Sequence, residues 1–155
     1  MDLFKYTAHE LHEQLVNKEI TAVELTNAVY DRIAAVDEQV NAYISLSKEE
    51  ALAKAAEVDA KIAAGEAIAP LAGIPVVFKD NINIYGQVTS CASKMLQGVE
   101  TVFDAHVTEE LRKEDAVFLG KANMAEFSIG NTTDNSFNGA VHNPWNLNCT
   151  TGGCA

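Results

Sequence analysis

Lys79 is the residue of this sequence best placed to do chemistry. It directly follows the apolar run Val76-Val77-Phe78, which predicts that its backbone lies at the end of a buried strand. A lysine that loses water there has a lowered pKa, and its neutral amine can act as a general base near neutral pH. In Ser–Lys catalysis such an amine takes the proton of a nucleophilic hydroxyl. The alternative is a solvated lysine that ends a strand and pairs with Asp80.

Cysteines and histidines indicate no metal centre. Cys91, Cys149 and Cys154 form neither an even disulfide set nor a C-x-x-C pair, and three thiols fit a reducing compartment. His9 and His12 are three residues apart, but no third ligand is evident. We therefore expect no metal and no cofactor on this chain.

Charge and hydropathy narrow the class of protein. The 155 residues carry 22 acidic and 11 basic side chains, a net charge of −11, and no stretch is basic enough to follow nucleic-acid phosphates. There is no apolar signal segment and no run long enough to span a membrane. We expect a cytoplasmic protein that binds neither nucleic acid nor a membrane directly.

The first 66 residues read as three helices in series. Capping-box patterns begin at Thr7, Thr21 and Ser47, each with a glutamate three residues later. After the third, an alanine-rich stretch from Ala51 to Ala64 stops at Gly65, a good helix terminator.

From residue 70 the pattern changes to strands and loops. Apolar runs predict buried strands at 74–78 and 116–119, the second closed by Gly120, with a helix between them that Asp104 caps. On that helix we expect Val107 and Leu111 to face inward. Strand, helix, strand at this spacing predicts a βαβ unit with parallel strands. Residues 131–148 read as a long loop, which Trp145 is expected to anchor by packing.

These elements predict one α/β portion over residues 1–155, helical over 1–66 and α/β over 70–155. A two-stranded parallel sheet is too small to bury both of its faces. The fold class is therefore α/β, with a sheet expected to be incomplete at the C-terminus.

The residues around Lys79 resemble a known family. The stretch LAGIPVVFKDN, residues 71–81, resembles the L-x-G-I-P-x-x-x-K-D-N stretch of the amidase-signature family. Residues 103–130 and Asn143-Pro144-Trp145 resemble further stretches of that family in the same order. The resemblance implies a mixed amidase sheet, with Lys79 as the base of a Ser–cis-Ser–Lys triad. The sequence GKANMAEF, residues 120–127, is most similar to the glutamine-hydrolysing A subunits of tRNA-dependent amidotransferases.

That resemblance also implies partners. Enzymes of this branch hydrolyse the side-chain amide of glutamine, and a partner subunit uses the ammonia to amidate Glu-tRNA(Gln) or Asp-tRNA(Asn). The implied partners are the B and C subunits, with ATP and magnesium held by a partner subunit. Met124 and Phe127 are expected either in the core or in the wall of a substrate pocket.

Other positions depart from the family pattern. Cys154 stands where the family has its cis-serine, and the nucleophilic serine lies further downstream in the family than this sequence reaches. Ala125 replaces a usual acidic residue. We therefore expect the isolated chain to be inactive. Two alternatives stay open: part of another amidase acting on small amides, or a non-enzymatic truncated module that self-associates into a homo-oligomer.

Overall fold

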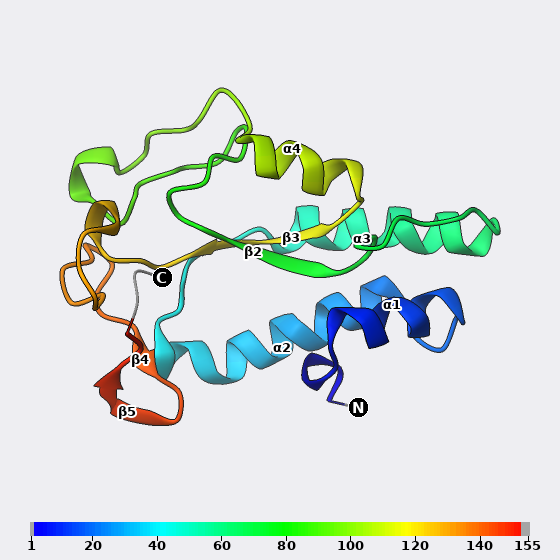
Figure 1. Cartoon of the computed structure of the whole chain (residues 1–155), viewed down its shortest axis with the longest axis horizontal. Helices are drawn as coiled ribbons and strands as arrows, with labels where there is room; N and C mark the ends of the chain where they lie inside the picture. The colour runs from blue at the N-terminus through cyan, green and yellow to red at the C-terminus, as the bar shows by residue number, and fades with distance from the viewer. Residues whose placement is uncertain (1, 153–155) are drawn as a thin grey trace. The chain divides into compact units, whose positions relative to one another are not determined.

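The computed structural model describes residues 2–152, and Figure 1 shows their elements in order. The helices are α1 (Ala8–Val16), α2 (Ala22–Val40), α3 (Lys48–Ala63) and α4 (His106–Lys113), with short 3-10 turns η1 (Leu3–Lys5), η2 (Lys94–Leu96) and η3 (Glu126–Ser128). The strands are β1 (Tyr43–Leu46), β2 (Pro75–Lys79), β3 (Val117–Ala122), β4 (His142–Asn143) and β5 (Asn146–Thr150).

Two compact units make up the described chain. The first unit comprises residues 2–35, Ser47–Val76 and Glu110–Leu119. The second unit comprises Val36–Leu46, Val77–Glu109 and residues 120–152. Each unit is therefore assembled from segments that are distant in sequence.

The first two helices begin as their sequences predict. The Thr7 hydroxyl accepts the Glu10 amide, and the Glu10 carboxylate accepts the Thr7 amide at 2.8 Å, which completes a capping box. Thr21 and Glu24 make the same reciprocal pair at the start of α2. Ser47 precedes α3 as predicted, but its side chain makes no capping hydrogen bond, so the third capping box is wrong.

In the first unit a side chain of α3 also caps the start of α2. The Asp59 carboxylate of α3 accepts hydrogen bonds from the Ala22 and Val23 amides at 2.7 and 3.1 Å. It therefore satisfies backbone donors at the start of α2 that have no partner within the helix. The core of this unit is mostly aliphatic. Its large members, none more than 6% exposed, are Leu3, Leu11, Leu15, Leu25, Tyr30, Ile33, Val58, Ile74, Val117 and Leu119.

The main sheet is mixed, in the order β1-β3-β2. Two hydrogen bonds, from the Val117 amide to the Ile74 carbonyl and from the Asp80 amide to the Ala122 carbonyl, advance in the same direction along both chains. Strands β2 and β3 are therefore parallel, and β2-α4-β3 is the predicted βαβ unit. Strand β1 pairs with β3 in the antiparallel sense.

The three predicted helices are present as α1, α2 and α3, and a short strand that was not predicted, β1, lies between α2 and α3. Its four residues, Tyr-Ile-Ser-Leu, are half-buried or exposed and are too few to show the alternation that marks a longer strand. Strand β3 also continues through Gly120 to Ala122, rather than ending at Gly120.

Burial of β2 and α4 differs from the prediction. In β2 only Phe78 is buried, and Val77 is 40% exposed, because β2 is an end strand of the described sheet. On α4, Val107 is 46% exposed while Thr108 is fully buried and donates its hydroxyl to the Asn83 carbonyl. The inward face of α4 is therefore set by Thr108, not by Val107.

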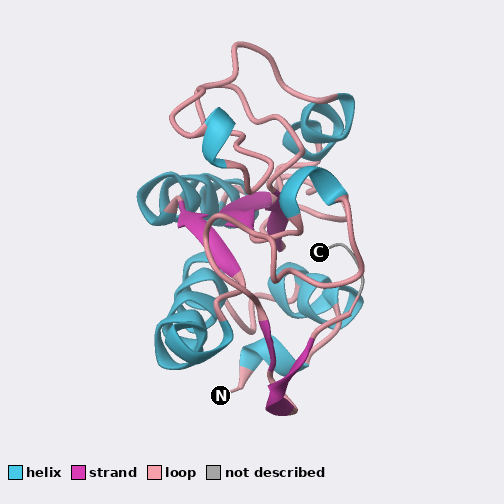
Figure 2. Cartoon of the chain, turned by 90° about the vertical axis from the view of Figure 1, so that its left-hand side faces the viewer, coloured by secondary structure: helices cyan, strands magenta, loops and turns pink. Residues whose placement is uncertain are grey.

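The predicted loop over 131–148 contains most of a β-hairpin. Strands β4 and β5 pair antiparallel around the turn Pro144-Trp145 and form a separate two-stranded sheet, drawn in magenta in Figure 2. Trp145 is 96% exposed, so it does not anchor this segment by packing. Among the described residues, no helix combines the length and apolar character needed to cross a bilayer.

Candidate active site

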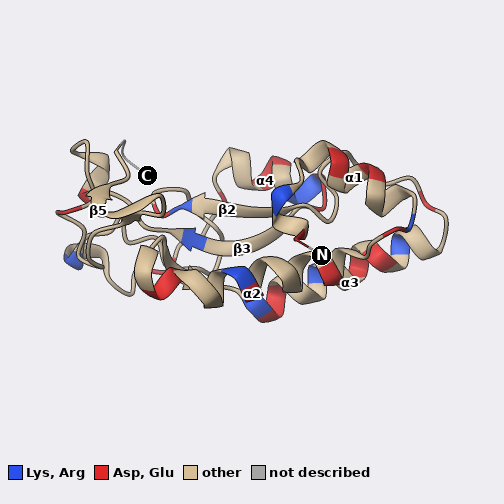
Figure 3. Ribbon diagram, turned by 90° about the horizontal axis from the view of Figure 1, so that it is seen from below, with Lys and Arg blue, Asp and Glu red and all other residues tan. Residues whose placement is uncertain are grey.

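Lys79 is the last residue of β2, as the sequence predicts, and its side chain is half-buried. The basic residues of β2 and β3, drawn in blue in Figure 3, are Lys79 and Lys121. Both lie toward the carboxyl ends of these parallel strands. This end of an α/β sheet is where ligand and catalytic groups of such folds usually gather.

The fully buried lysine of the second unit is Lys121, which sequence reasoning did not single out. Its ammonium group lies 3.2 Å from the Asp80 carboxylate, and both side chains are 1% exposed. Burial lowers the pKa of Lys121, and the charge of Asp80 opposes that shift. The available signal was a lysine placed inside an otherwise apolar strand, a position that lysine occupies only with a partner.

Asp80 also holds the turn at Ser90–Ala92 by hydrogen bonds. Its Oδ2 accepts the Ser90 amide at 3.1 Å, the Ser90 hydroxyl at 2.5 Å and the Ala92 amide at 3.3 Å. Cys91 and Ala92 have φ angles of 52° and 53°, in the left-handed region that non-glycine residues seldom occupy. The hydrogen bonds to Asp80 hold this turn in its unfavourable conformation.

A second left-handed pair lies against the first. Phe127 and Ser128 have φ angles of 50° and 60°, and the Phe127 amide donates to the Cys91 carbonyl at 3.0 Å. Asn81, two residues after Lys79, donates to the Ser128 hydroxyl at 3.4 Å. Four strained residues thus gather beside the end of β2. Strain of this kind, about 1–3 kcal/mol per residue, concentrates at functional sites.

The other predicted site residues are distributed unevenly. Met124 is fully buried and belongs to the core, whereas Phe127 is 43% exposed beside the strained turn. Ala125 is also fully buried. Cys154 lies outside the described residues. Burial, followed by the charge of Asp80, raises the pKa of the Cys91 thiol, so Cys91 is not an activated nucleophile.

This corner of the second unit can therefore supply a positioned amine. Its amine is carried by the last residue of β2, and the hydrogen-bonded turn beside that residue fixes where the lysine side chain begins. Among residues 2–152 no group of three or more histidine, cysteine or acidic side chains is arranged to hold a metal ion.

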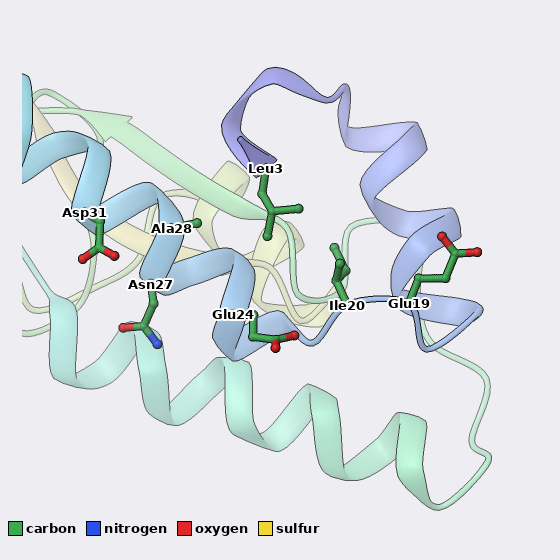
Figure 4. Close-up of a pocket in the computed structure, with 7 residues that line it drawn as sticks. All are labelled: Leu3, Glu19, Ile20, Glu24, Asn27, Ala28 and Asp31. Carbon is green, nitrogen blue, oxygen red and sulfur yellow. The ribbon is translucent and has the colours of Figure 1, made fainter. Parts of the chain in front are cut away.

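A hollow of about 460 Å³ lies elsewhere, in the first unit (Figure 4). Its lining consists of Leu3, Glu19, Ile20, Glu24, Asn27, Ala28 and Asp31. Three of these side chains are carboxylates, and Glu24 is engaged in the cap with Thr21. None of the strand-end residues lines this hollow, so its size does not make it the candidate active site.

Known proteins are similar to this chain over most of its length. Residues 24–155 match the family model described as Amidase. The chain is 51% identical, over 153 residues, to the A subunit of the glutamyl-tRNA(Gln) amidotransferase of Clostridium botulinum strain Loch Maree. That alignment covers 99% of this chain and 32% of the relative, so the chain spans about a third of the length of the curated relatives it matches.

Solved structures agree with the sequence comparison. The peptide amidase of Stenotrophomonas maltophilia superposes with a TM-score of 0.83 at 34% identity, over 92% of this chain and 31% of that enzyme. A bacterial aryl acylamidase of the amidase-signature family superposes with a TM-score of 0.88 at 29% identity, over 96% of this chain and 31% of that enzyme.

Proposed function

The chain belongs to the amidase family, and we propose that it is the N-terminal part of the glutamine-hydrolysing subunit of a tRNA-dependent amidotransferase. The observation that carries this proposal is the 51% identity to the Clostridium botulinum A subunit, which extends over 99% of the chain. The position of Lys79 at the end of β2 supports it, because the reaction needs a base held on a rigid element.

In the proposed reaction Lys79 is the general base. The proton of a serine hydroxyl passes to the Lys79 amine, and the serine oxygen attacks the side-chain amide carbon of glutamine. That proton then passes to the amide nitrogen, ammonia leaves and an acyl-serine forms, which water hydrolyses to release glutamate. The nucleophilic serine and the groups that stabilise the oxyanion come from sequence beyond this chain. Cys154 would stand at the proton-relay position, where a thiol differs from a hydroxyl in geometry and acidity.

The proposed partners are the B and C subunits of the amidotransferase, in the cytoplasm. The ammonia would be used on Glu-tRNA(Gln) or Asp-tRNA(Asn). ATP and magnesium would be bound by a partner subunit, with no cofactor on this chain. A net charge of −11 supports the view that another chain holds the RNA, because phosphates bind basic surfaces.

A chimaera tests the role of Lys79. Residues 2–152 replace the matching segment of the Clostridium botulinum A subunit, and the ammonia released from glutamine is measured. We expect the chimaera to be active and Lys79→Met to lower kcat by about 100- to 10,000-fold. The control is Lys94→Met, which removes an exposed lysine of the same unit. An active Lys79→Met chimaera would overturn the proposed role.

The second candidate is an amidase that acts on small amides without a tRNA partner. The similarity to a peptide amidase and an aryl acylamidase favours it. Co-expression with the Clostridium botulinum B and C subunits separates the two candidates. The segment of equal length from the Clostridium botulinum A subunit is the control. Co-purification of both segments supports the amidotransferase, whereas co-purification of the control alone supports the second candidate.

A further inference from the structure

The buried ion pair of Asp80 and Lys121 lies beside the end of β2, and both of its charged groups have hydrogen-bond partners. The Lys121 ammonium group has three protons and meets three acceptors: the Asp80 carboxylate at 3.2 Å, the Thr89 hydroxyl at 2.9 Å and the Val88 carbonyl at 3.3 Å. The Asp80 carboxylate in turn accepts from Ser90 and Ala92. A lysine with three acceptors is bound as a cation.

The backbone of Asp80 is fixed on both sides as well. Its amide donates to the Ala122 carbonyl at the end of β3, and its carbonyl accepts the Cys91 amide, each at 3.1 Å. The residue that directly follows Lys79 is therefore held by β3, by the strained turn at Cys91 and by a buried ion pair. Lys79 ends β2 and is half-buried, whereas Asp80, the turn residue that follows it, is 1% exposed, so these neighbouring side chains have different surroundings.

We infer that Asp80 and Lys121 are positioning residues for the proposed base: they fix the chain at the root of Lys79 and do not themselves meet the substrate. This inference rests on the proposed function, in which Lys79 accepts a proton. The pair anchors the residue next to Lys79 and so fixes where the lysine side chain begins. A displacement of about 1 Å at such a root can slow catalysis by about 100-fold.

Charge balance separates positioning from simple stabilisation. Removing one member of a buried ion pair leaves an uncompensated charge and destabilises the fold, whereas replacing both members with neutral side chains of similar volume restores much of the stability. A purely structural pair predicts that activity returns together with stability. A positioning pair predicts that stability returns and activity does not.

The test uses the chimaera described above, with Asp80→Asn, Lys121→Met and the double variant. We expect each single variant to lower both Tm and kcat. The double variant should regain most of the lost Tm while kcat stays about 10- to 100-fold low and KM changes little. Recovery of kcat in parallel with Tm in the double variant would overturn the inference.

A milder variant covers the case in which the charge variants do not fold. Ser90→Ala removes a hydrogen bond to Asp80 and keeps both charges, so we expect kcat to fall severalfold with KM unchanged. Ser136→Ala is the matched control, because it removes a buried serine hydroxyl that bonds Asn123 instead. Equal kcat values in the two serine variants would count against positioning. Lys79→Met tests the proposed function separately. If this variant stays active, the proposed function is wrong, whatever the Asp80 and Lys121 variants show.

Discussion

Gly120 of β3 lies directly against the carbonyl group of Ser45 in β1. A β-carbon at Gly120 would overlap the Ser45 oxygen, and the glycine φ of 143° is in a region that side chains disfavour. Because Gly120 has no β-carbon, β1 can approach β3 closely enough to pair with it at Gly120 and at the neighbouring Lys121.

Gly120→Ala should therefore unfold the second unit or destabilise it by more than ~3 kcal/mol, since it combines strain with overlap against backbone. Chemical denaturation of the isolated chain measures this. Gly98→Ala is the control, because Gly98 also has a positive φ but nothing lies within 4 Å of the added carbon. Equal losses in the two variants would show that the contact with Ser45 is unimportant.

Asp115 should make stability fall at acid pH. Its hydrogen bond to Lys61 is the main cause that lowers the pKa of its carboxyl below 3.8, and Lys54 adds to the effect. A carboxyl with a lowered folded-state pKa stabilises the protein above its unfolded-state pKa. That contribution is lost as the pH falls through the folded-state pKa.

Asp115→Asn should thus reduce the difference in unfolding free energy between neutral pH and about pH 2, by ~1 kcal/mol or less because the pair is partly exposed. Asparagine also tolerates the left-handed φ of 55° at this position. Lys61→Met should flatten the same profile. An unchanged pH profile in both variants would contradict the assignment.

Asp59 should contribute to stability through the start of α2. Asp59→Ala removes the acceptor for the Ala22 and Val23 amides and should cost about 1 kcal/mol. Urea denaturation gives the change in midpoint. Asp31→Ala, on the exposed side of α2, is the control and should change the midpoint little. A midpoint unchanged by Asp59→Ala would mean that water replaces the cap.

Trp145 provides a fluorescence test, since it is the single tryptophan of the chain and 96% exposed. We expect emission typical of a solvated indole in the isolated chain, strong quenching by acrylamide, and no loss of stability in Trp145→Ala. In the chimaera, a blue shift would show that the added sequence covers this side chain. A blue-shifted, protected tryptophan in the isolated chain at low concentration would contradict the exposed hairpin.

We expect the isolated chain to self-associate, because the segment that connects β2 to β3 carries exposed apolar side chains. Those of the second unit that are at least 60% exposed are Tyr85, Met95, Val102 and Phe103. Exposed apolar side chains that gather into a patch usually mark surfaces that another protein surface covers. Sedimentation should show concentration-dependent oligomers, and Val102→Ser with Phe103→Ser should weaken them. A single monomeric species at all concentrations would contradict this expectation.

Local sequence determined much of the framework. Capping pairs at Thr7 and Thr21 fixed where α1 and α2 begin, because a threonine and a glutamate three residues apart satisfy each other's free amides. The βαβ unit followed from two apolar runs around a helix, and the end of β2 at Lys79 followed from the change from apolar to polar residues. These are short-range signals, so one sequence is enough to reveal them.

Only the tertiary structure decided that Lys121 is buried and which residues surround Lys79. Lys121 meets Asp80 only because parallel pairing of β2 with β3 brings residues 80 and 121 together. The short strand β1, the exposed face of β2 and the exposure of Trp145 were likewise hidden, since burial depends on which segments pack across the fold and not on a residue's neighbours in sequence. The amino-acid sequence placed Lys79 at a strand end, and long-range contacts built the rigid corner that holds it.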